Sequence, residues 1–207
     1  MNQLRCQHES GGIINYGMIE VQEQLDASTF LLPDDCVLEL GGRWGGVSII
    51  INSQLKDKTK HLVVEPDSRV WEVLEKNRDT HGCQFHIVKG AISNQKLNLD
   101  IDDKKYHGLA SFTKPSTDGR GDVPIYKLQD FEDKVTNFNV LIADCEGFLE
   151  TFFDENKEIF KNLRLILFEK DRPEACDYDR LKEEFKQLGF FEYRDNGEHC
   201  VFIRQII

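Results

Sequence analysis

Hydrophobic residues along the chain fall into two alternating patterns. Short, mostly apolar runs are typical of buried strands and cover residues 37–40, 61–64, 85–88, 139–143 and 163–168. Apolar residues at three- and four-residue spacing are typical of helices and cover residues 46–55, 67–80, a run ending near 160, and 178–188. Short connections between these elements predict right-handed βαβ units. We therefore expect an α/β fold with a mostly parallel sheet and helices on both faces.

The N-terminal part of the chain departs from this alternation. Residues 1–15 are polar and contain glycine, so we expect them to be loosely held. Four apolar residues at helical spacing follow them, namely Met18, Ile19, Val21 and Leu25. They predict a helix that ends at residues 26–28 and belongs to an N-terminal extension, residues 1–35. This helix either packs against the sheet or covers one side of a ligand cleft.

The C-terminal part carries a hairpin signal. Apolar residues 190–193 and 200–204 flank the turn Asp195-Asn196-Gly197, and Asn-Gly is a favoured two-residue hairpin turn. Gly189 ends the helix before it. We therefore expect an antiparallel hairpin at the end of the parallel sheet.

Residues 92–124 interrupt the strand–helix rhythm. Residues 97–106 predict a small strand or hairpin, and residues 107–122 read as a long loop rich in glycine, serine and threonine. Loops of this size inside compact domains often serve as lids or binding elements. We interpret the segment as a variable insertion on the acceptor side. A short strand and a brief helix near residues 131–135 follow it.

A glycine-rich turn follows the first predicted strand. Its glycines do not match the first, third and sixth positions of a dinucleotide fingerprint, and no Gly-Lys-Ser/Thr ends a phosphate loop. The remaining pattern is an acid, Glu39, followed by Gly41 and Gly45, and it resembles the first motif of S-adenosylmethionine-dependent methyltransferases. A turn that serves only to redirect the chain has the same appearance. The broken fingerprint disfavours a nicotinamide oxidoreductase.

Three successive strand ends carry candidate ligand-binding groups. Glu39 and Gly41 end the first strand, Glu65 ends the second before Pro66, and Ala91 follows the third. Ligands of open α/β sheets bind outside the carboxyl ends of the strands. One crevice can therefore collect all three groups.

Composition limits the classes of function. The 207 residues suit a single domain, and the net charge of −11 argues against a nucleic acid partner. No apolar run is long enough to span a membrane, and the N-terminus lacks the apolar core of a signal peptide. The six cysteines are scattered without a CxxC pair, which disfavours a zinc site and a disulfide framework. We expect a cytoplasmic protein.

With these residues placed, the chain resembles the FkbM family of S-adenosylmethionine-dependent methyltransferases from about Val37 to Phe191. The segments that carry the resemblance are VLELGGRWGG, VVEPDSRVWEVLEKN, VKGAIS, VPIYKLQDF, LIADCEGFLETFF and LRLILFEKD. LIADCEGFLETFF is the most specific of them. The resemblance implies a Rossmann-like class I methyltransferase fold with a seven-stranded sheet. The chain departs from the family pattern at Gly42, Arg43, Gln129 and Ala143, which puts the cofactor contacts and the acceptor in doubt.

The resemblance also implies roles for single residues. Glu65 would accept hydrogen bonds from the ribose of the cofactor, by the logic of the ribose-binding acid of dinucleotide folds. The other implied cofactor contacts are Glu39, Gly41, Gly42, Gly45, Ala91 and Asp144. Glu39 would orient the glycine turn or the cofactor's amino group, and Ala91 would contact adenine through its N–H.

A hydroxyl acceptor requires a base, because its pKa lies far above neutral. Asp144 is the first candidate, and Glu146, Glu169 and His107 are the others. Asp144, Glu146 and Glu169 could instead bind a divalent metal. Glu146 could also only stabilise the N-terminus of the next helix, and His107 could simply be solvated.

These inferences converge on an O-methyltransferase that acts on a sugar hydroxyl of a glycan, either alone or as part of a larger multi-domain transferase. The alternatives are a methyltransferase for a non-sugar hydroxyl and a non-catalytic glycan-binding or scaffold module with the same fold. The retained acids Glu39, Glu65, Asp144 and Glu146 disfavour the non-catalytic alternative.

Overall fold

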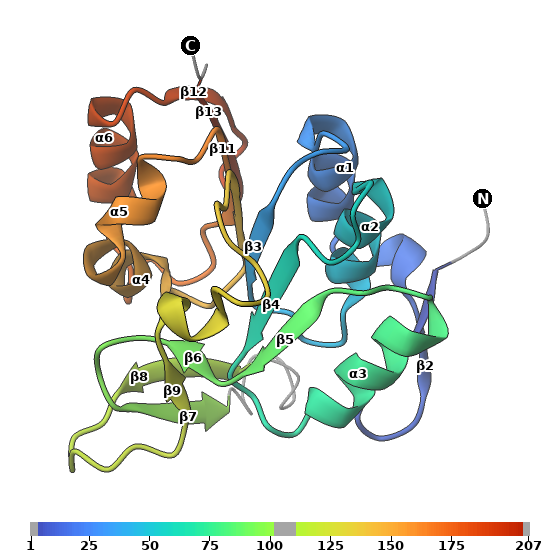
Figure 1. The fold of residues 1–207 in the computed structure, drawn as a ribbon. Helices are drawn as coiled ribbons and strands as arrows, with labels where there is room; N and C mark the ends of the chain where they lie inside the picture. The colour runs from blue at the N-terminus through green and yellow to red at the C-terminus, as the bar shows by residue number, and fades with distance from the viewer. Residues whose placement is uncertain (1–3, 102–110, 205–207) are drawn as a thin grey trace.

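A seven-stranded sheet forms the centre of the molecule (Figure 1). The computed structural model describes residues 4–101 and 111–204. The strand order is β12-β13-β11-β10-β3-β4-β5. In that order the strands span Phe191–Asp195, His199–Ile203, Leu165–Glu169, Val140–Ala143, Val37–Leu40, His61–Glu65 and His86–Lys89. Strand β13 runs antiparallel to the other six strands, so the predicted mostly parallel sheet with a C-terminal hairpin is confirmed.

The strand ends that matter for function lie at one edge of this sheet. Leu40, at the end of β3, pairs with Val64 of β4 and with Ala143 of β10. Ala143 in turn pairs with Phe168 of β11. The chain order reverses between β3 and β10, and such a switch point leaves a crevice at the carboxyl ends of the strands.

Helices cover both faces of the sheet, as predicted. Figure 1 shows α1, α2 and α3 on one side and α4, α5 and α6 on the other. The helices span Val21–Phe30, Gly46–Gln54, Trp71–Thr80, Leu149–Glu155, Lys157–Phe160 and Tyr178–Gln187. The predicted run ending near residue 160 is therefore two short helices.

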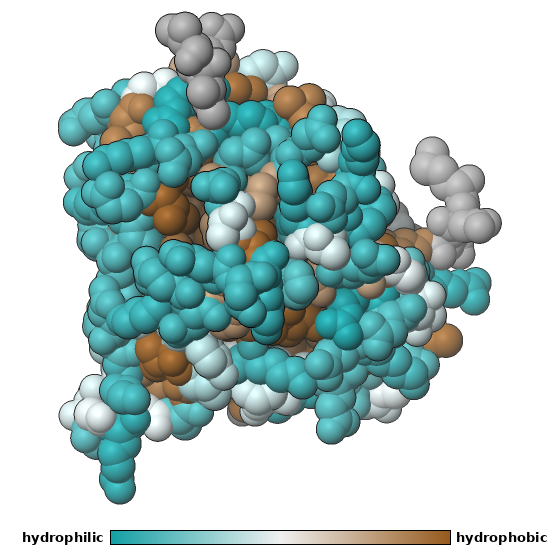
Figure 2. Space-filling model, in the orientation of Figure 1, coloured by the Kyte–Doolittle hydropathy of each residue, from teal (hydrophilic) through white to brown (hydrophobic). Residues whose placement is uncertain are grey.

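Side chains of β3 alternate between two separate cores, because successive residues of a strand point to opposite faces. Leu38 packs with Phe152 and Phe185 on the side of α4 and α6. Val37 packs with Ala27 of α1 and Ile51 of α2 on the other side. The face seen in Figure 2 is mostly hydrophilic, and apolar atoms show mainly in the hollows between polar side chains.

The N-terminal extension is better ordered than the sequence indicated. Residues 5–7 (β1) and 13–15 (β2) form an antiparallel hairpin, so the prediction of a loose segment is wrong for residues 4–15. Asn77 of α3 anchors this hairpin by accepting from the N–H of Gln7 and donating to its carbonyl, both at 2.9 Å. This tertiary partner, 70 residues away, leaves no local signal in the sequence.

Helix α1 begins and ends later than predicted. Met18 belongs to a preceding 3-10 turn, η1 (Tyr16–Met18), and its side chain is 81% exposed. The buried face of α1 consists of Asp26 and Ala27 instead, and the helix continues to Phe30. Both interpretations of this region hold in part, because Ala27 packs on the sheet while Ile19 lines the cavity described below.

The insertion contains more structure than a loop. β6 (Ala91–Ile92) pairs with β9 (Ile125–Tyr126), and β7 (Leu97–Ile101) pairs with β8 (Ser111–Pro115). β8 lies within the segment predicted as loop. The brief helix is the 3-10 helix η2 at Leu128–Phe131, earlier than predicted. Among the described residues, no helix combines the length and apolar character needed to cross a bilayer.

Candidate functional site

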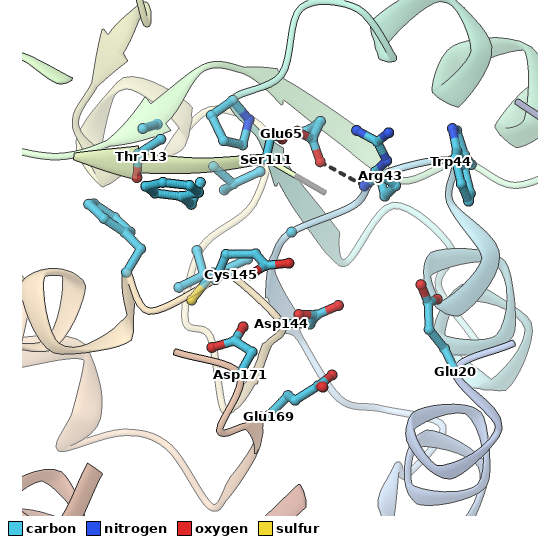
Figure 3. A pocket seen from close by; sticks show the side chains of 18 of the residues that line it. Glu20, Arg43, Trp44, Glu65, Ser111, Thr113, Asp144, Cys145, Glu169 and Asp171 are labelled. Atoms are coloured by element: carbon cyan, nitrogen blue, oxygen red, sulfur yellow. Dashed lines mark hydrogen bonds between the residues drawn. The ribbon is translucent and has the colours of Figure 1, made fainter. Parts of the chain in front are cut away.

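A cavity of about 720 Å³ lies at the carboxyl ends of β3, β4, β10 and β11 (Figure 3). This volume is in the usual range for small-molecule sites. The N-terminal hairpin with η1 and the strand β8 also contribute to its walls. The residues that line it are His8, Ile14, Ile19, Glu20, Leu40, Gly41, Arg43, Trp44, Val64, Glu65, Pro66, Ala91, Ser111, Phe112, Thr113, Asp144, Cys145, Glu146, Phe148, Glu169 and Asp171.

Gly41 is the one glycine of the predicted motif that lines the cavity. Its φ of +93° is a conformation that other residues avoid. A Cβ atom on Gly41 would lie 1.7 Å from the carbonyl oxygen of Asp144. The turn therefore requires glycine at this position for two reasons: backbone conformation and close contact with the end of β10.

Gly42 and Gly45 face the protein interior instead of the cavity. A Cβ atom on Gly42 would lie 2.4 Å from Val63, and one on Gly45 would lie 2.8 Å from Leu74. Their role as cofactor contacts stays a prediction, and the structure gives them a packing role between α3, the glycine turn and the sheet.

Glu65 is held in place by three backbone N–H groups. Oε2 accepts from Gly42 at 3.1 Å and from Arg43 at 2.7 Å, and Oε1 accepts from Asp67 at 2.7 Å. Burial raises the pKa of Glu65 to about 7, although these N–H groups and the charge of Arg43 oppose the rise. A carboxylate offers about four acceptor positions, so at least one is left for a ligand hydroxyl in the cavity.

Glu39 is not among the residues that line the cavity. Its side chain is 2% exposed and accepts a hydrogen bond from Ser48 at 2.8 Å, and its other oxygen lies 2.8 Å from Nε2 of His61. Strand alternation turns it toward α2 and away from the crevice. Glu39 therefore ties the helix after the glycine turn to β3 and β4.

Ala91 lines the cavity, but its N–H donates to the carbonyl of Pro124 at 2.9 Å. This bond belongs to the pairing of β6 with β9, which the sequence did not reveal. The predicted contact of this N–H with adenine would have to share the donor with Pro124.

Carboxylates gather at the ends of β10 and β11. Figure 3 shows Asp144, Glu169 and Asp171 close together, with Glu20 facing them from the N-terminal segment. Ligand-capable atoms of Glu20, Glu23 and Asp144 lie within 4.8 Å of one another, and those of Glu23, Glu169 and His199 do so as well. The acids of α1 and the turn before it are thus brought to the strand ends.

Crowding and burial shift the protonation of these acids. Burial, with the charges of Glu39 and Glu169, raises the pKa of Glu20 to about 7. Burial and neighbouring carboxylates raise the pKa of Glu23 and of Asp144 well above their ordinary values, and burial raises that of Glu169. Each of these four acids therefore loses its proton at a higher pH than a free carboxylic acid does.

The predicted metal set is only partly assembled. Asp144 belongs to the first of these two residue clusters and Glu169 to the second. Within the part of the chain that the structure describes, Glu146 belongs to neither. Glu146 lines the cavity from the loop before α4 and has a φ of +49°. His107 lies outside the described residues.

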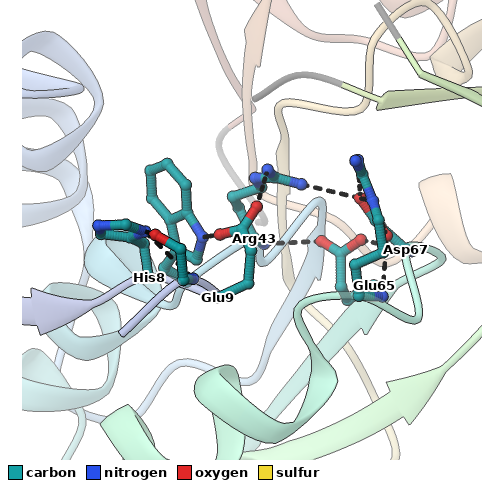
Figure 4. A network of polar contacts seen from close by, with 8 residues as sticks. His8, Glu9, Arg43, Glu65 and Asp67 are labelled. Carbon is teal, nitrogen blue, oxygen red and sulfur yellow. Dashed lines mark hydrogen bonds and ion pairs between the residues drawn. The ribbon is translucent and has the colours of Figure 1, made fainter. Parts of the chain in front are cut away.

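A polar network that the sequence analysis did not find fixes the glycine turn (Figure 4). Arg43, at a φ of +42°, donates to Asp67 at 2.8 Å and to Glu9 at 3.0 Å. Glu9 also accepts from the indole N–H of Trp44, and Asp67 accepts from Arg69. The N-terminal hairpin is thereby joined to the turn that follows β3. Nothing in the sequence pattern pairs Glu9 with Arg43.

Comparisons with known proteins bear on the fold. No protein-family model matches the chain, and no curated protein matches it. Solved structures do. A ribosomal protein L11 methylase from Lactobacillus delbrueckii subsp. bulgaricus is 10% identical, with a TM-score of 0.51, over 90% of this chain and 78% of the other.

Two more solved structures agree with it. A candidate O-methyltransferase from Klebsiella pneumoniae is 12% identical, with a TM-score of 0.51, over 91% of this chain and 82% of the other. A precorrin-6y C5,15-methyltransferase from Geobacter metallireducens is 12% identical, with a TM-score of 0.51, over 89% and 87% of the two chains. At such identities the likeness establishes the fold alone, which is the Rossmann-like methyltransferase fold.

Proposed function

We propose that the protein is an S-adenosylmethionine-dependent O-methyltransferase whose acceptor is a sugar hydroxyl. The observation that carries the proposal is the convergence of Gly41, Glu65 and Asp144 on one cavity at the switch point of the sheet. The methyltransferase fold and the resemblance of the LIADCEGFLETFF segment to the FkbM family support it.

The residues present fit the cofactor at the end of the cavity formed by β3 and β4. Glu65 retains acceptor capacity for a ribose hydroxyl, and its carboxylate is oriented by three N–H groups. Gly41 leaves the backbone open to close approach. When bound, S-adenosylmethionine would supply a methyl carbon whose bond to sulfur breaks with the electron pair remaining on sulfur.

Asp144 is our proposed general base. Asp144 follows β10 and lines the cavity together with Gly41. Its backbone carbonyl oxygen is the atom that a Cβ on Gly41 would meet. Burial and the neighbouring carboxylates raise the pKa of Asp144 well above its ordinary value, and a higher pKa makes its carboxylate a stronger base. As the acceptor oxygen forms its bond to carbon, its proton passes to Asp144. Positioning of the two reactants within the cavity supplies a further part of the rate.

Titration calorimetry with S-adenosylhomocysteine tests the proposal. We expect micromolar binding, on the order of −8 kcal/mol, and no binding of a nicotinamide dinucleotide. A screen of sugars with S-adenosylmethionine then follows, with formation of S-adenosylhomocysteine as the readout. Absence of binding to the methyl-donor product would overturn the proposal and favour a scaffold module. Binding without turnover on any sugar, but with turnover on another hydroxyl compound, would correct the acceptor only.

A further inference from the structure

The half of the cavity next to β11 is lined by more carboxyl groups than the single net positive charge of the proposed cofactor can pair with. Glu20, Asp144, Glu169 and Asp171 all line it. Nε2 of His199 lies 3.8 Å from Glu169. Arg172, which follows Asp171 in the chain, pairs with Glu174 and lies over the ring of Phe112. Arg43 also lines the cavity, but its guanidinium is engaged by Asp67 and Glu9. S-adenosylmethionine has one net positive charge, from its sulfonium, ammonium and carboxylate groups.

Asp171 provides an observation that is independent of the charge count. Its Oδ1 accepts from the hydroxyl of Tyr178 at 2.7 Å, which fixes the side chain. Its Oδ2 is fully buried and has no hydrogen-bond partner in the described structure. Oε2 of Glu23, beside Asp144 and Glu169, is in the same condition. Buried carboxylate oxygens without a donor are unfavourable, so a donor from a ligand would be stabilising.

Aromatic side chains line the same cavity. Trp44, Phe112 and Phe148 contribute to its walls. The ring of Phe112 already has the guanidinium of Arg172 3.7 Å from its centroid. Aromatic rings bind the apolar faces of sugar rings and attract cations through their π faces. An acceptor with both a ring and a positive charge therefore matches the aromatic side chains as well as the acidic side chains that line this cavity.

We infer that the acceptor carries a protonated amine, which Glu169 and Asp171 bind, while a hydroxyl of the same molecule receives the methyl group beside Asp144. The acceptor class is then an amino sugar or a similar amino alcohol. This inference rests on the proposed function and specifies its substrate class. A phosphorylated or carboxylated sugar is excluded by the same carboxylates, because like charges at this distance repel.

The amine is preferred to a divalent metal as the missing cation for a geometric reason. Two clusters of residues could hold a metal ion. Each cluster includes Glu23, and neither includes Asp171. The unpartnered oxygen of Asp171 thus stays unexplained by either cluster. An ammonium group donates three hydrogen bonds in different directions and can reach acids that do not converge on one point.

Three sugars that differ in charge test the inference. Glucosamine, glucose and glucuronate are titrated into the full chain saturated with S-adenosylhomocysteine, in buffer that contains EDTA. We expect glucosamine to bind about ten-fold or more tightly than glucose, since hydrogen bonds to charged groups are the stronger ones. Glucuronate should bind most weakly. Because burial raises the pKa of Glu169, binding of the amine beside it should also release protons, measured in buffers of different ionisation enthalpy.

Two variants localise the effect. Asp171→Asn keeps the acceptor atom for Tyr178, and Glu169→Gln is the second, independent test. Each should reduce the preference for glucosamine over glucose several-fold and leave affinity for S-adenosylhomocysteine unchanged. Asp179→Asn, on the exposed face of α6, is the matched control and should keep the preference.

The outcomes separate the two proposals. Failure of S-adenosylhomocysteine to bind would overturn the proposed function itself. If S-adenosylhomocysteine binds but the three sugars bind equally, or none of them binds, the amine inference is wrong and the proposed function stands. Sugar binding that requires added Mg²⁺ and ignores the amine would assign the carboxylates to a metal instead.

Discussion

The carboxylate of Glu65 accepts the backbone N–H of Arg43 at 2.7 Å. This bond joins the end of β4 to the glycine turn after β3, and Gly42 donates to the same oxygen. The acid that is proposed to hold the ribose therefore also holds the turn that is proposed to meet the rest of the cofactor. Binding and local structure are coupled at this residue, and mutations must separate them.

The first prediction concerns Glu65→Gln. An amide places an NH₂ group where an oxygen now accepts backbone N–H groups, so we expect the free energy of unfolding to fall by on the order of 1–2 kcal/mol. Affinity for S-adenosylhomocysteine should fall about 10- to 100-fold. Calorimetry and thermal unfolding measure the two effects. Glu72→Gln, exposed on α3, is the control; unchanged affinity in E65Q would refute the ribose assignment.

The second prediction compares two glycines with positive φ. Gly41→Ala would place a Cβ 1.7 Å from the carbonyl of Asp144, whereas Gly82→Ala has no atom within 4 Å of its Cβ. Both variants carry backbone strain of about 1 kcal/mol. Only Gly41→Ala adds a clash, so its destabilisation should exceed about 3 kcal/mol. Chemical denaturation measures both; equal losses would show that the contact with Asp144 relaxes freely.

The third prediction concerns Asp144→Asn. Loss of the base should reduce turnover about 100- to 10,000-fold, while affinity for S-adenosylhomocysteine changes little. At a pH above the raised pKa of Asp144 the variant should be more thermally stable than the wild type, because a charge is then absent from among Glu20, Glu23 and Glu169. Turnover of the wild type should rise with pH as the carboxyl with its raised pKa loses its proton. Normal turnover in D144N would transfer the base role to another group.

The fourth prediction is a pH dependence of stability. The pKa of Glu20 is raised from 4.5 to about 7, first by burial and then by Glu39 and Glu169, against the opposing Tyr16 hydroxyl and Arg43. The folded state thus holds a proton that the unfolded state has lost between pH 4.5 and 7. The contribution of Glu20 to the free energy of unfolding is fully present below the pKa of its unfolded state. It disappears as pH rises through the pKa of its folded state.

Glu20→Gln should remove that dependence. The free energy of unfolding of E20Q minus that of the wild type should be about 1–2 kcal/mol larger at pH 7 than at pH 4.5. Denaturation at a series of pH values measures the difference. Glu183→Gln, exposed on α6, should show no such trend. If the free energy of unfolding of E20Q changes with pH as that of the wild type does, the Glu20 side chain is exposed to solvent and its pKa is not raised.

The fifth prediction concerns metal removal. Because we assign the acceptor-side acids to an amine, we expect EDTA to leave turnover and S-adenosylhomocysteine affinity unchanged. Added Mg²⁺ or Ca²⁺ should not raise the unfolding temperature beyond the effect of matched ionic strength. Loss of turnover with EDTA that added Mg²⁺ restores would show that the carboxylates bind a metal.

Local sequence was sufficient to predict the sheet. The runs at 37–40 and 61–64 became β3 and β4 with at most one residue of difference, because a strand buried on both faces is mostly apolar. The Asn-Gly turn likewise marked the hairpin of β12 and β13. The N-terminal hairpin was missed, since its strands have only three residues each and are fixed by Asn77, 70 residues away from Gln7.

The strand-end residues were identified from the sequence with mixed results. Gly41, Glu65 and Asp144 meet in one cavity, because parallel strands expose their carboxyl ends at one edge. Glu39 does not reach it, although it is only two residues from Gly41. Its neighbours Ser48 and His61 attract the carboxylate to the opposite face of the sheet, and a motif alone does not show this.

The sequence by itself determined which segments are strands and which strand ends carry glycine or acid, since burial and turn chemistry are local properties. Only the tertiary structure decided that Glu20 and Glu23 of the N-terminal segment face Asp144 and Glu169. It also decided that Glu9 binds Arg43 across the glycine turn. Such contacts depend on how the elements pack in space. A pair of charges that are distant in sequence leaves no repeating pattern along the chain from which it could be predicted.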